Sequence, residues 1–381
     1  MFPNSFFPEI HGKLAFGCMR LPFQGDYVDI DQFKAMVDAF LDAGFNYFDT
    51  AHGYLGGQSE TALREGLTSR YPREKYLLTN KLSDGFFHSE AEIRPLFETQ
   101  LACCGVDYFD FYLMHAQNRN NFQKYKACRA YETAFALKEE GKIRHVGLSF
   151  HDTPDILDQI LTEYPQIEVV QIQFNYLDYE DEAVQSKACY EVCVKHGKPV
   201  LIMEPVKGGN LVNLPPKGQE AIDECNAQLG TSFSNASYAI RFAAGFPQVA
   251  CVLSGMSNME QMEDNIQTMC HFDPLNLTET GAIAKVVDSY RSLGLIACTS
   301  CHYCVLENHC PKQIPIPELF ACYNAKAAFH EWNQNMYYAI KTREGGKASD
   351  CIRCGGCERA CPQHLPIREL LEKVAEEFEK R

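Results

Sequence analysis

Eight cysteines toward the end of the chain have spacings that suit iron–sulfur chemistry. The second of two runs is Cys351, Cys354, Cys357 and Cys361, followed directly by Pro362. Three cysteines at every third position let one short loop supply three corners of a 4Fe–4S cluster. The fourth, after a turn stiffened by proline, points toward another cluster. The spacing C-x2-C-x2-C-x3-C-P therefore predicts a site with two clusters.

The first run has the same pattern with a longer final gap. Cys298, Cys301 and Cys304 are again three positions apart, and Cys310-Pro311 follows after the residues VLENH. A pair of zinc sites is the alternative, because zinc is also held by C-x2-C pairs. Zinc needs only two cysteines from each run, so the third cysteine and the Cys-Pro would have no role. The two runs favour two 4Fe–4S clusters.

The fourth cysteine of each run is expected to ligate the cluster of the other run. One cluster would then take Cys298, Cys301, Cys304 and Cys361, and the other would take Cys351, Cys354, Cys357 and Cys310. The other cysteines lie mostly in apolar surroundings, where a free cysteine behaves as a small buried hydrophobe. They are Cys18, Cys103, Cys104, Cys128, Cys189, Cys193, Cys225, Cys251, Cys270 and Cys322.

Three polar residues suited to acid–base chemistry lie in or at the end of apolar runs elsewhere in the chain. Asp49 lies in NYFDTA, Lys81 in YLLTNKL and His115 in YFDFYLMHA. Short apolar runs bounded by turn-forming residues predict buried strands. Eight such runs begin at Leu14, Asn46, Tyr76, Tyr108, His145, Val169, Pro199 and Val249.

Amphipathic segments separate these runs. Phe33, Met36, Val37 and Phe40, for example, have the spacing of a helix with one buried face. Eight strand–helix units predict an α/β fold, a closed (β/α)8 TIM barrel. A doubly wound open sheet is the competing architecture, but it normally carries G-x-G-x-x-G after its first strand, where this chain has GCMRLP. We find no internal repeat other than the strand–helix unit.

Chemistry in such barrels gathers at the C-terminal ends of the strands, where Asp49, Lys81 and His115 are expected to meet. Together with DTAHGYLGGQSE at residues 49–60, these residues resemble the aldo/keto reductases, (β/α)8 barrels that reduce carbonyl compounds with NAD(P)H. The resemblance implies a catalytic tetrad that also includes Tyr54. Tyr54 would protonate the carbonyl oxygen, and Lys81 would lower the tyrosine pKa. Asp49 would hold Lys81, and His115 would orient the substrate oxygen.

The same resemblance implies contacts to a dinucleotide. The segment GMSNMEQMEDN would hold the adenosine end through Gly255, Ser257, Gln261 and Asn265. Ser149 and Gln171 match contacts to the nicotinamide carboxamide. Asn258 stands where a cation often meets the 2′-phosphate of NADP, Phe150 where Asn is usual and Met203 where a stacking Tyr is usual. NAD(P)H is the expected cofactor, with NAD and NADP both open, and a flavin at the barrel mouth is the alternative.

The segment between the two cysteine runs predicts a small helical domain. Residues from about Ile316 to Lys341 are rich in Ala, Phe, Tyr and Glu, which favours helix. This spacer resembles the α-helical ferredoxin modules found inside larger redox enzymes. We predict a barrel domain over residues 1–294 and a mainly α-helical ferredoxin-like domain over residues 295–381.

Charge and hydropathy argue against other classes of protein. The 35 Lys and Arg against 50 Asp and Glu give a formal charge of −15, which repels nucleic acid and anionic lipid. No apolar stretch approaches the roughly 18 residues of a membrane helix. The N-terminal residues lack the basic start and apolar run of a secretory signal. We expect a cytoplasmic protein that binds neither nucleic acid nor membrane.

These features together predict an iron–sulfur oxidoreductase that interconverts a small carbonyl compound and an alcohol. Nicotinamide passes two electrons together as hydride, whereas each cluster passes one electron at a time. The clusters would therefore either exchange electrons with a partner protein or stabilise the fold. The alternative is a barrel without activity that acts as an electron-transfer or redox-sensing subunit. GLSFHD and MEPVKGG also carry His151, Glu204 and Lys207 to the barrel mouth, as substrate contacts or as surface groups.

Overall fold

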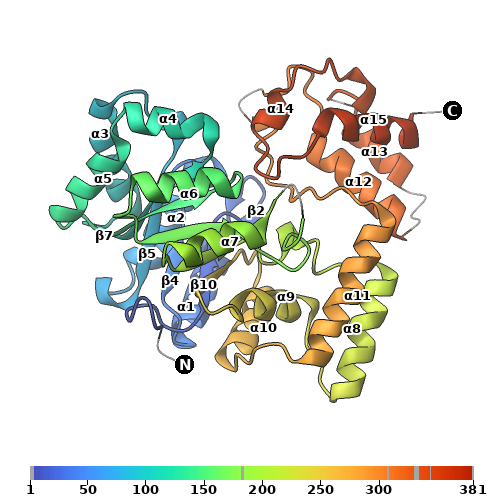
Figure 1. The fold of residues 1–381 in the computed structure, drawn as a ribbon, viewed down its shortest axis with the longest axis horizontal. Coiled ribbons are helices and arrows are strands. Elements are labelled where there is room, and N and C mark those ends of the chain that lie inside the picture. The colour runs from blue at the N-terminus through green and yellow to red at the C-terminus, as the bar shows by residue number, and fades with distance from the viewer. Residues whose placement is uncertain (1–3, 182–183, 307–308, 330–333, 344, 380–381) are drawn as a thin grey trace. The chain divides into compact units, whose positions relative to one another are not determined.

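Within the described residues, eight parallel strands form a closed barrel in the computed structural model of the chain (Figure 1). The structure describes residues 4–181, 184–306, 309–329, 334–343 and 345–379. The first strand pairs with both the second and the last strand of the barrel, which closes the ring and confirms the predicted (β/α)8 fold. The barrel strands are β1 (Leu14–Gly17), β4 (Tyr47–Asp49), β5 (Leu77–Leu82), β6 (Phe109–Gln117), β7 (Ile143–Phe150), β8 (Val169–Gln173), β9 (Val200–Met203) and β10 (Val249–Ser254).

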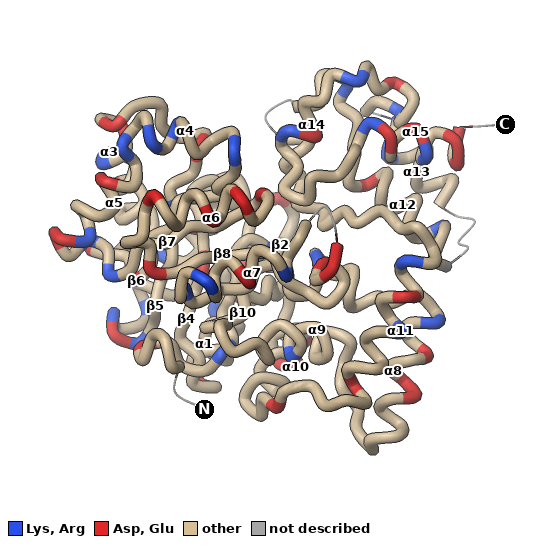
Figure 2. Tube along the Cα trace, in the orientation of Figure 1, with Lys and Arg blue, Asp and Glu red and all other residues tan. Residues whose placement is uncertain are grey.

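Amphipathic helices follow the strands and cover the barrel. In the first of them the Asp29 side chain caps the helix by accepting from the Gln32 amide, and the predicted face of Phe33, Met36, Val37 and Phe40 is buried. The helices of the barrel are α1 (Ile30–Asp42), α2 (Gln58–Leu63), α3 (Glu90–Cys104), α4 (Arg119–Ala127), α5 (Ala130–Glu139), α6 (Pro154–Glu163), α7 (Ser186–Lys195), α9 (Asn235–Ala244) and α10 (Met259–Cys270). Charged residues lie mainly along these helices and the loops, and the strands are mostly uncharged (Figure 2).

One hairpin was not expected from the sequence. β2 (Phe23–Gln24) and β3 (Tyr27–Val28) pair in antiparallel fashion outside the barrel. Strands of two residues carry too little alternation to be recognised as apolar runs.

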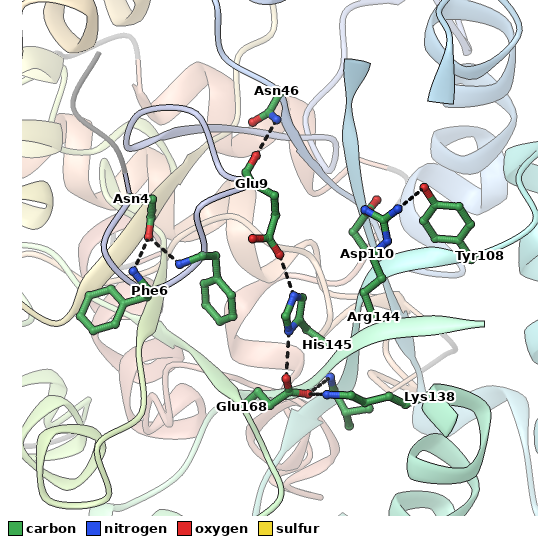
Figure 3. A network of polar contacts seen from close by, with 12 residues as sticks. Asn4, Phe6, Glu9, Asn46, Tyr108, Asp110, Lys138, Arg144, His145 and Glu168 are labelled. Atoms are coloured by element: carbon green, nitrogen blue, oxygen red, sulfur yellow. Dashed lines mark hydrogen bonds and ion pairs between the residues drawn. The ribbon is translucent and has the colours of Figure 1, made fainter. Parts of the chain in front are cut away.

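The N-terminal residues pack against the barrel where its strands begin (Figure 3). Asn4 donates to the Ala250 carbonyl, and the Phe7 ring lies edge-on to Phe111 inside the barrel core. Glu9 reaches His145 near the start of β7, at 2.7 Å between Oε1 and Nε2. This segment therefore belongs to the end of the barrel opposite the predicted chemistry.

The described chain divides into two compact units. The first consists of Met1–Glu180, Gln185–Pro205 and Ala236–Leu275, which hold the barrel. The second consists of Asp181–Val184, Val206–Asn235 and Asn276–Arg381.

The second unit is helical, as predicted for the C-terminal part of the chain. Its core contains Leu319, Phe320, Leu371 and Val374 together with buried cysteines. Its helices are α8 (Pro216–Leu229), α11 (Leu277–Leu293), α12 (Ile316–Phe329), α13 (Gln334–Lys341), α14 (Gly356–Arg359) and α15 (Ile367–Phe378). Among the helices that the structure describes, none has both the length and the apolar character that a membrane crossing requires.

Candidate active site and cysteine centres

The four residues of the predicted tetrad come together at the C-terminal ends of the strands. Asp49 ends β4, and Lys81 and His115 lie near the C-terminal ends of β5 and β6. Parallel pairing brings these ends to one side of the barrel. Tyr54 enters the same site from the turn after β4, just after Gly53, whose φ of 89° favours glycine.

A buried ion pair supports the tyrosine. Lys81 Nζ lies 2.5 Å from Asp49 Oδ1 and donates to the Thr50 carbonyl oxygen at 2.8 Å. The same ammonium lies 5.0 Å from the centroid of the Tyr54 ring. Tyr54 Oη lies 3.5 Å from His115 Nε2. Two groups able to contact a substrate oxygen therefore converge in front of a buried, hydrogen-bonded charge pair.

The expected lowering of the Tyr54 pKa is wrong in this structure. Burial raises the pKa of this phenol well above its ordinary value, and the carboxylates of Asp49 and Glu204 raise it further. Lys81 does not outweigh them, because its own charge is paired with Asp49. Tyr54 therefore keeps its proton near neutral pH, as a general acid must.

His115 is a neutral imidazole held by a serine. Burial lowers its pKa well below the ordinary value, and the positive charge of Lys81 acts in the same direction. Ser83 Oγ lies 2.6 Å from His115 Nδ1. Ser83 was not predicted as a site residue, although it directly follows β5 at the end of the barrel where chemistry gathers.

The predicted nicotinamide contacts are buried beside the tetrad. Gln171 is 2% exposed and its Nε2 donates to Asp49 Oδ2 at 3.5 Å. Among the described residues no donor reaches Gln171 Oε1. Ser149 Oγ instead accepts from the Ala116 amide at 2.7 Å. A carboxamide N–H would satisfy the Gln171 oxygen, so this end of the site fits a nicotinamide ring.

The predicted adenosine contacts lie in the loop after β10 and in α10. Gly255 and Ser257 lie in the loop, and the Ser257 amide donates to Gln261 Oε1 at 2.8 Å. Asn265 is buried and donates to Ser254 Oγ at 2.7 Å. The hydroxyl of Ser257 donates to the Arg20 carbonyl oxygen at 2.8 Å.

Three further polar residues lie at the C-terminal ends of the strands, and two of them, Glu204 and His151, were predicted there. Glu204 directly follows β9, and its Oε1 lies 3.9 Å from Arg20 Nη2. Arg20 gave no sequence signal, because it lies in a loop of irregular structure. His151 directly follows β7 and interacts electrostatically with His115.

The cysteines of the second unit gather in two sets. Burial raises the pKa of Cys361 to about 11, and Cys301 and Cys298 of the other run raise it further. The pKa of Cys357 is also raised to about 11, first by burial and then by its neighbours, which include Cys351 and Cys310. Cys361 therefore lies near Cys298 and Cys301, and Cys310 lies near Cys357, as crossed ligation would require.

A small pocket marks the second set. It is lined by Cys310, Cys351, Cys354 and Cys357 and by apolar side chains such as Leu371. Within the described parts of the chain, no three Cys, His, Asp or Glu side chains are close enough to ligate one metal ion. Four thiols around one small cavity are a donor set that fits a 4Fe–4S cluster.

The two cysteine loops have the same backbone pattern. Ser300 and Arg353 have φ of 52° and 57°, and each follows the first cysteine of its run by two positions. Their amides donate to Cys298 Sγ and Cys351 Sγ, both at 3.4 Å. His302 and Gly355, and then Gln313 and His364, also match in position and in positive φ. The expectation of no further repeat is therefore wrong, and CPKQIPIPEL and CPQHLPIREL carry the missed signal.

The first cysteine loop packs against the chain that follows Val206. A Cβ at Gly208 would lie 2.3 Å from the Thr299 carbonyl oxygen, so only glycine allows this approach. Asn210 Nδ2 donates to the Cys298 carbonyl oxygen at 2.8 Å. Lys207 is buried, and its positive charge acts on the Cys298 thiol.

Two parts of the chain match models of known protein families. Residues 13–288 match the model of the aldo/keto reductase family. The chain belongs to the aldo/keto reductase family. Residues 297–365, which contain both cysteine runs, match the model of a 4Fe-4S dicluster domain. The predicted family and its C-terminal iron–sulfur domain are confirmed.

Relatives of this aldo/keto reductase include oxidoreductases of several organisms. An uncharacterized oxidoreductase of Bacillus subtilis, YqkF, is 25% identical over 67% of this chain and 86% of that protein. An NADH-specific methylglyoxal reductase of Escherichia coli is 28% identical over 48% of this chain and 60% of that protein. An L-galactose dehydrogenase of Arabidopsis thaliana is 24% identical over 67% of this chain and 83% of that protein.

Solved structures of the family share the barrel. An aldo-keto reductase of Klebsiella pneumoniae in complex with NADPH has a TM-score of 0.58 at 20% identity, over 72% of this chain and 90% of that chain. An aldo-keto reductase of Bacillus halodurans in its holo form has a TM-score of 0.55 at 25% identity, over 72% and 91%. The family and the relatives together make this chain an oxidoreductase enzyme.

Proposed function

We propose that this aldo/keto reductase interconverts a small carbonyl compound and an alcohol with NAD(P)H, using Asp49, Tyr54, Lys81 and His115. The observation that carries the proposal is the convergence of Tyr54 and His115, 3.5 Å apart, in front of the buried Lys81. A protonated phenol and a neutral imidazole are the groups that can polarise and protonate one carbonyl oxygen.

The roles of the side chains follow from their partners. Ser83 donates to His115 Nδ1, so that Nε2 carries the proton and donates to the substrate oxygen. Tyr54 transfers its proton to that oxygen. Lys81, whose Nζ lies 5.0 Å from the centroid of the Tyr54 ring, stabilises the resulting phenolate. Asp49 keeps the ammonium in place. A bound nicotinamide would supply the hydride for the carbonyl carbon.

A nicotinamide dinucleotide is favoured over the flavin alternative. Gln171 offers a buried carbonyl oxygen without a donor among the described residues, which suits a carboxamide N–H. An NADH-specific relative and a solved structure in complex with NADPH support the same class of cofactor. Gly255, Ser257, Gln261 and Asn265 remain the proposed adenosine contacts, and Ser149 a proposed neighbour of the carboxamide.

We also propose two 4Fe–4S clusters in the C-terminal domain. Cys298, Cys301, Cys304 and Cys361 would hold one cluster, and Cys310, Cys351, Cys354 and Cys357 the other. Such clusters would supply one-electron storage. Cys354 is exposed, so the second cluster would face an electron-transfer partner protein. The proposed boundary between residues 294 and 295 lies between the two family matches, at residues 13–288 and 297–365, whereas the second compact unit also takes in α8 and α11.

The catalytic proposal is tested with Tyr54→Phe. We expect turnover of NADPH or NADH with a panel of carbonyl compounds to be lost, with the iron–sulfur absorbance unchanged. Tyr27→Phe is the matched control, because Tyr27 is 74% exposed and should leave turnover unchanged. Unchanged turnover in Tyr54→Phe contradicts the proposal, and cluster reduction without any turnover in the wild type supports the electron-transfer alternative. Release of flavin from anaerobically purified protein contradicts the nicotinamide assignment.

The cluster proposal is tested by iron content. Anaerobically purified wild type should hold about eight irons per chain. Cys354→Ser and Cys310→Ser should each impair the same cluster, although they lie in different runs, and Cys301→Ser should impair the other. Cys270→Ser is the control, because Cys270 lies in α10 of the barrel. Zinc in place of iron, or loss of the same electron paramagnetic resonance signal in Cys354→Ser and Cys301→Ser, contradicts the assignment.

A further inference from the structure

A buried lysine lies beside the first cysteine run. Lys207 is 1% exposed, and its φ of 49° lies in the left-handed region that residues other than glycine seldom adopt. Burying a charged side chain and holding its backbone in this conformation both cost free energy. Two such costs at one residue point to a function for its ammonium group.

Backbone contacts hold the turn of Lys207 against the loop of Cys298. Asn210 Nδ2 donates to the Lys207 carbonyl oxygen at 2.9 Å and to the Cys298 carbonyl oxygen at 2.8 Å, so one side-chain amide joins the two segments. Gly208, with a φ of 63°, lies so close to the Thr299 carbonyl oxygen that a Cβ would be 2.3 Å away from it. The lysine is therefore fixed beside a cysteine of the first set.

Side chains of opposite charge act on the Cys298 thiol. Burial raises the pKa of this thiol to about 11. The charge of Lys207 lowers the pKa because it favours the thiolate, and the carboxylate of Glu318 in α12 raises it. Glu318 is 30% exposed and its Oε1 lies 3.6 Å from His302 Nδ1. Since water screens an exposed charge more than a buried one, Lys207 should have the stronger effect.

We propose that Lys207 raises the reduction potential of the cluster held by Cys298, Cys301, Cys304 and Cys361. This inference rests on the proposed function, because it requires a 4Fe–4S cluster on these thiols. Cys304 interacts electrostatically with the three other thiols, so the four lie together. One-electron reduction breaks no bond and adds one negative charge to a site that four thiolates already make negative. A buried ammonium nearby stabilises the added charge and so favours the reduced form.

The charges near the second set of cysteines are different ones. Glu358 and Arg368 both act on Cys357, and Arg368 Nη2 lies 2.7 Å from Glu358 Oε2. Opposite charges this close largely cancel each other's effect on a third group. Because Lys207 is held against the loop of Cys298, a member of the first set only, removing its charge should affect the first cluster much more than the second.

The test is a redox titration of anaerobically purified, cluster-loaded protein with dithionite, followed by electron paramagnetic resonance. The first cluster is the one whose signal Cys301→Ser impairs. Lys207→Met and Lys207→Gln, which remove the charge, should make its reduction about 10-fold less favourable, a shift of about −59 mV for one electron. Lys207→Arg should keep the wild-type potential. Glu318→Gln should shift the same potential in the positive direction, by less.

Lys285→Met is the matched control. Lys285 lies in α11 of the same unit, is 66% exposed and pairs with Glu224, so both potentials should stay unchanged. Shifts of opposite sign at Lys207 and Glu318 cannot both come from damage to the fold. Loss of the first cluster in both uncharged Lys207 variants would assign this residue a role in assembly and contradict the inference.

Failure of the inference can be told from failure of the cluster proposal. If wild type shows two clusters and the uncharged Lys207 variants leave the first potential unchanged, or shift both potentials equally, the inference is wrong and the clusters stand. If wild type holds no iron, the cluster proposal is wrong and the inference fails with it.

Discussion

The two ends of the barrel both contain buried charge, but they differ in the number and length of the polar contacts around it. Where the strands begin, Asp110 is fully buried and accepts from the Leu78 amide, from Arg73 and from Arg144. His145, in the same region, contacts a carboxylate through each ring nitrogen. Figure 3 shows His145 between Glu9 and Glu168, and Arg144 beside Asp110 and Tyr108.

Where the strands end, several polar contacts are longer, and one buried oxygen has no donor within the described chain. Gln171 Oε1 has no donor among the described residues, and Arg20 and Glu204 are 3.9 Å apart. The contact between Tyr54 Oη and His115 Nε2 is long, at 3.5 Å. Several short contacts to one buried charge hold the chain together, whereas an oxygen without a donor and groups with long contacts can be used by a substrate or cofactor. We therefore expect substitutions at the N-terminal end to affect stability and those at the C-terminal end to affect turnover.

The strongest test at the N-terminal end is Asp110→Ala. It removes the acceptor of the Leu78 amide and leaves Arg73 without its buried partner, which should lower the free energy of unfolding by about 3–5 kcal/mol. Turnover per folded molecule should stay unchanged. Urea unfolding and steady-state kinetics measure the two quantities. The control is Asp38→Ala, in an exposed pair with Arg70, where the loss should be about 1 kcal/mol or less. Equal losses in the two variants contradict the assignment of Asp110.

The corresponding test at the C-terminal end is His115→Phe, which should affect turnover and not stability. Turnover should fall about 100- to 1000-fold, because one donor to the reacting oxygen is lost. The urea midpoint should stay the same or rise, since the variant removes a partly exposed polar group and keeps a ring of similar size. A variant that loses stability and activity together contradicts the separation of the two ends.

A smaller effect at the N-terminal end is a dependence of the unfolding free energy on pH. Burial lowers the pKa of His145, but Glu168 and Glu9 outweigh it, so the folded pKa lies above the ordinary 6.5. The stability that the charged ring provides is therefore complete below 6.5 and is lost as the pH rises through the raised pKa. The pKa of Glu168 is lowered from 4.5 to about 2, although burial opposes this, so its contribution is lost as the pH falls below 4.5.

The measurement compares wild type with His145→Gln in urea at several pH values. The difference in unfolding free energy should be largest between about pH 4.5 and 6.5, on the order of 1 kcal/mol, and should shrink above that range. His11→Gln serves as the control, because His11 is exposed and should give no pH-dependent difference. A difference that grows as the pH rises contradicts the charged bridge.

The barrel strands and the tetrad could be predicted from the sequence, but some of the polar contacts around the tetrad could not. Strands could be predicted because each is a short buried run, and parallel pairing then places Asp49, Lys81 and His115 together. The pair of Arg20 and Glu204 could not be predicted, because it depends on a left-handed turn and on the path of a long side chain. The similar spacing of the two cysteine runs was predicted, but the repeat that continues past Cys310 and Cys361 was missed, because the unequal final gaps put its two halves out of register.

The smallest effect concerns Ser83, which positions His115 without contacting the reacting atoms. With Ser83→Ala, His115 Nδ1 loses the hydroxyl 2.6 Å away, and the ring can rotate or carry its proton on Nδ1 instead of Nε2. Turnover should fall about 10-fold with little change in KM, because only the orientation of a transition-state donor is lost. Ser83→Thr, which keeps the hydroxyl, should restore most of the activity. The nitrogen NMR shifts of His115 should report the change of tautomer, and a variant that loses activity with the wild-type tautomer intact would assign Ser83 a structural role only.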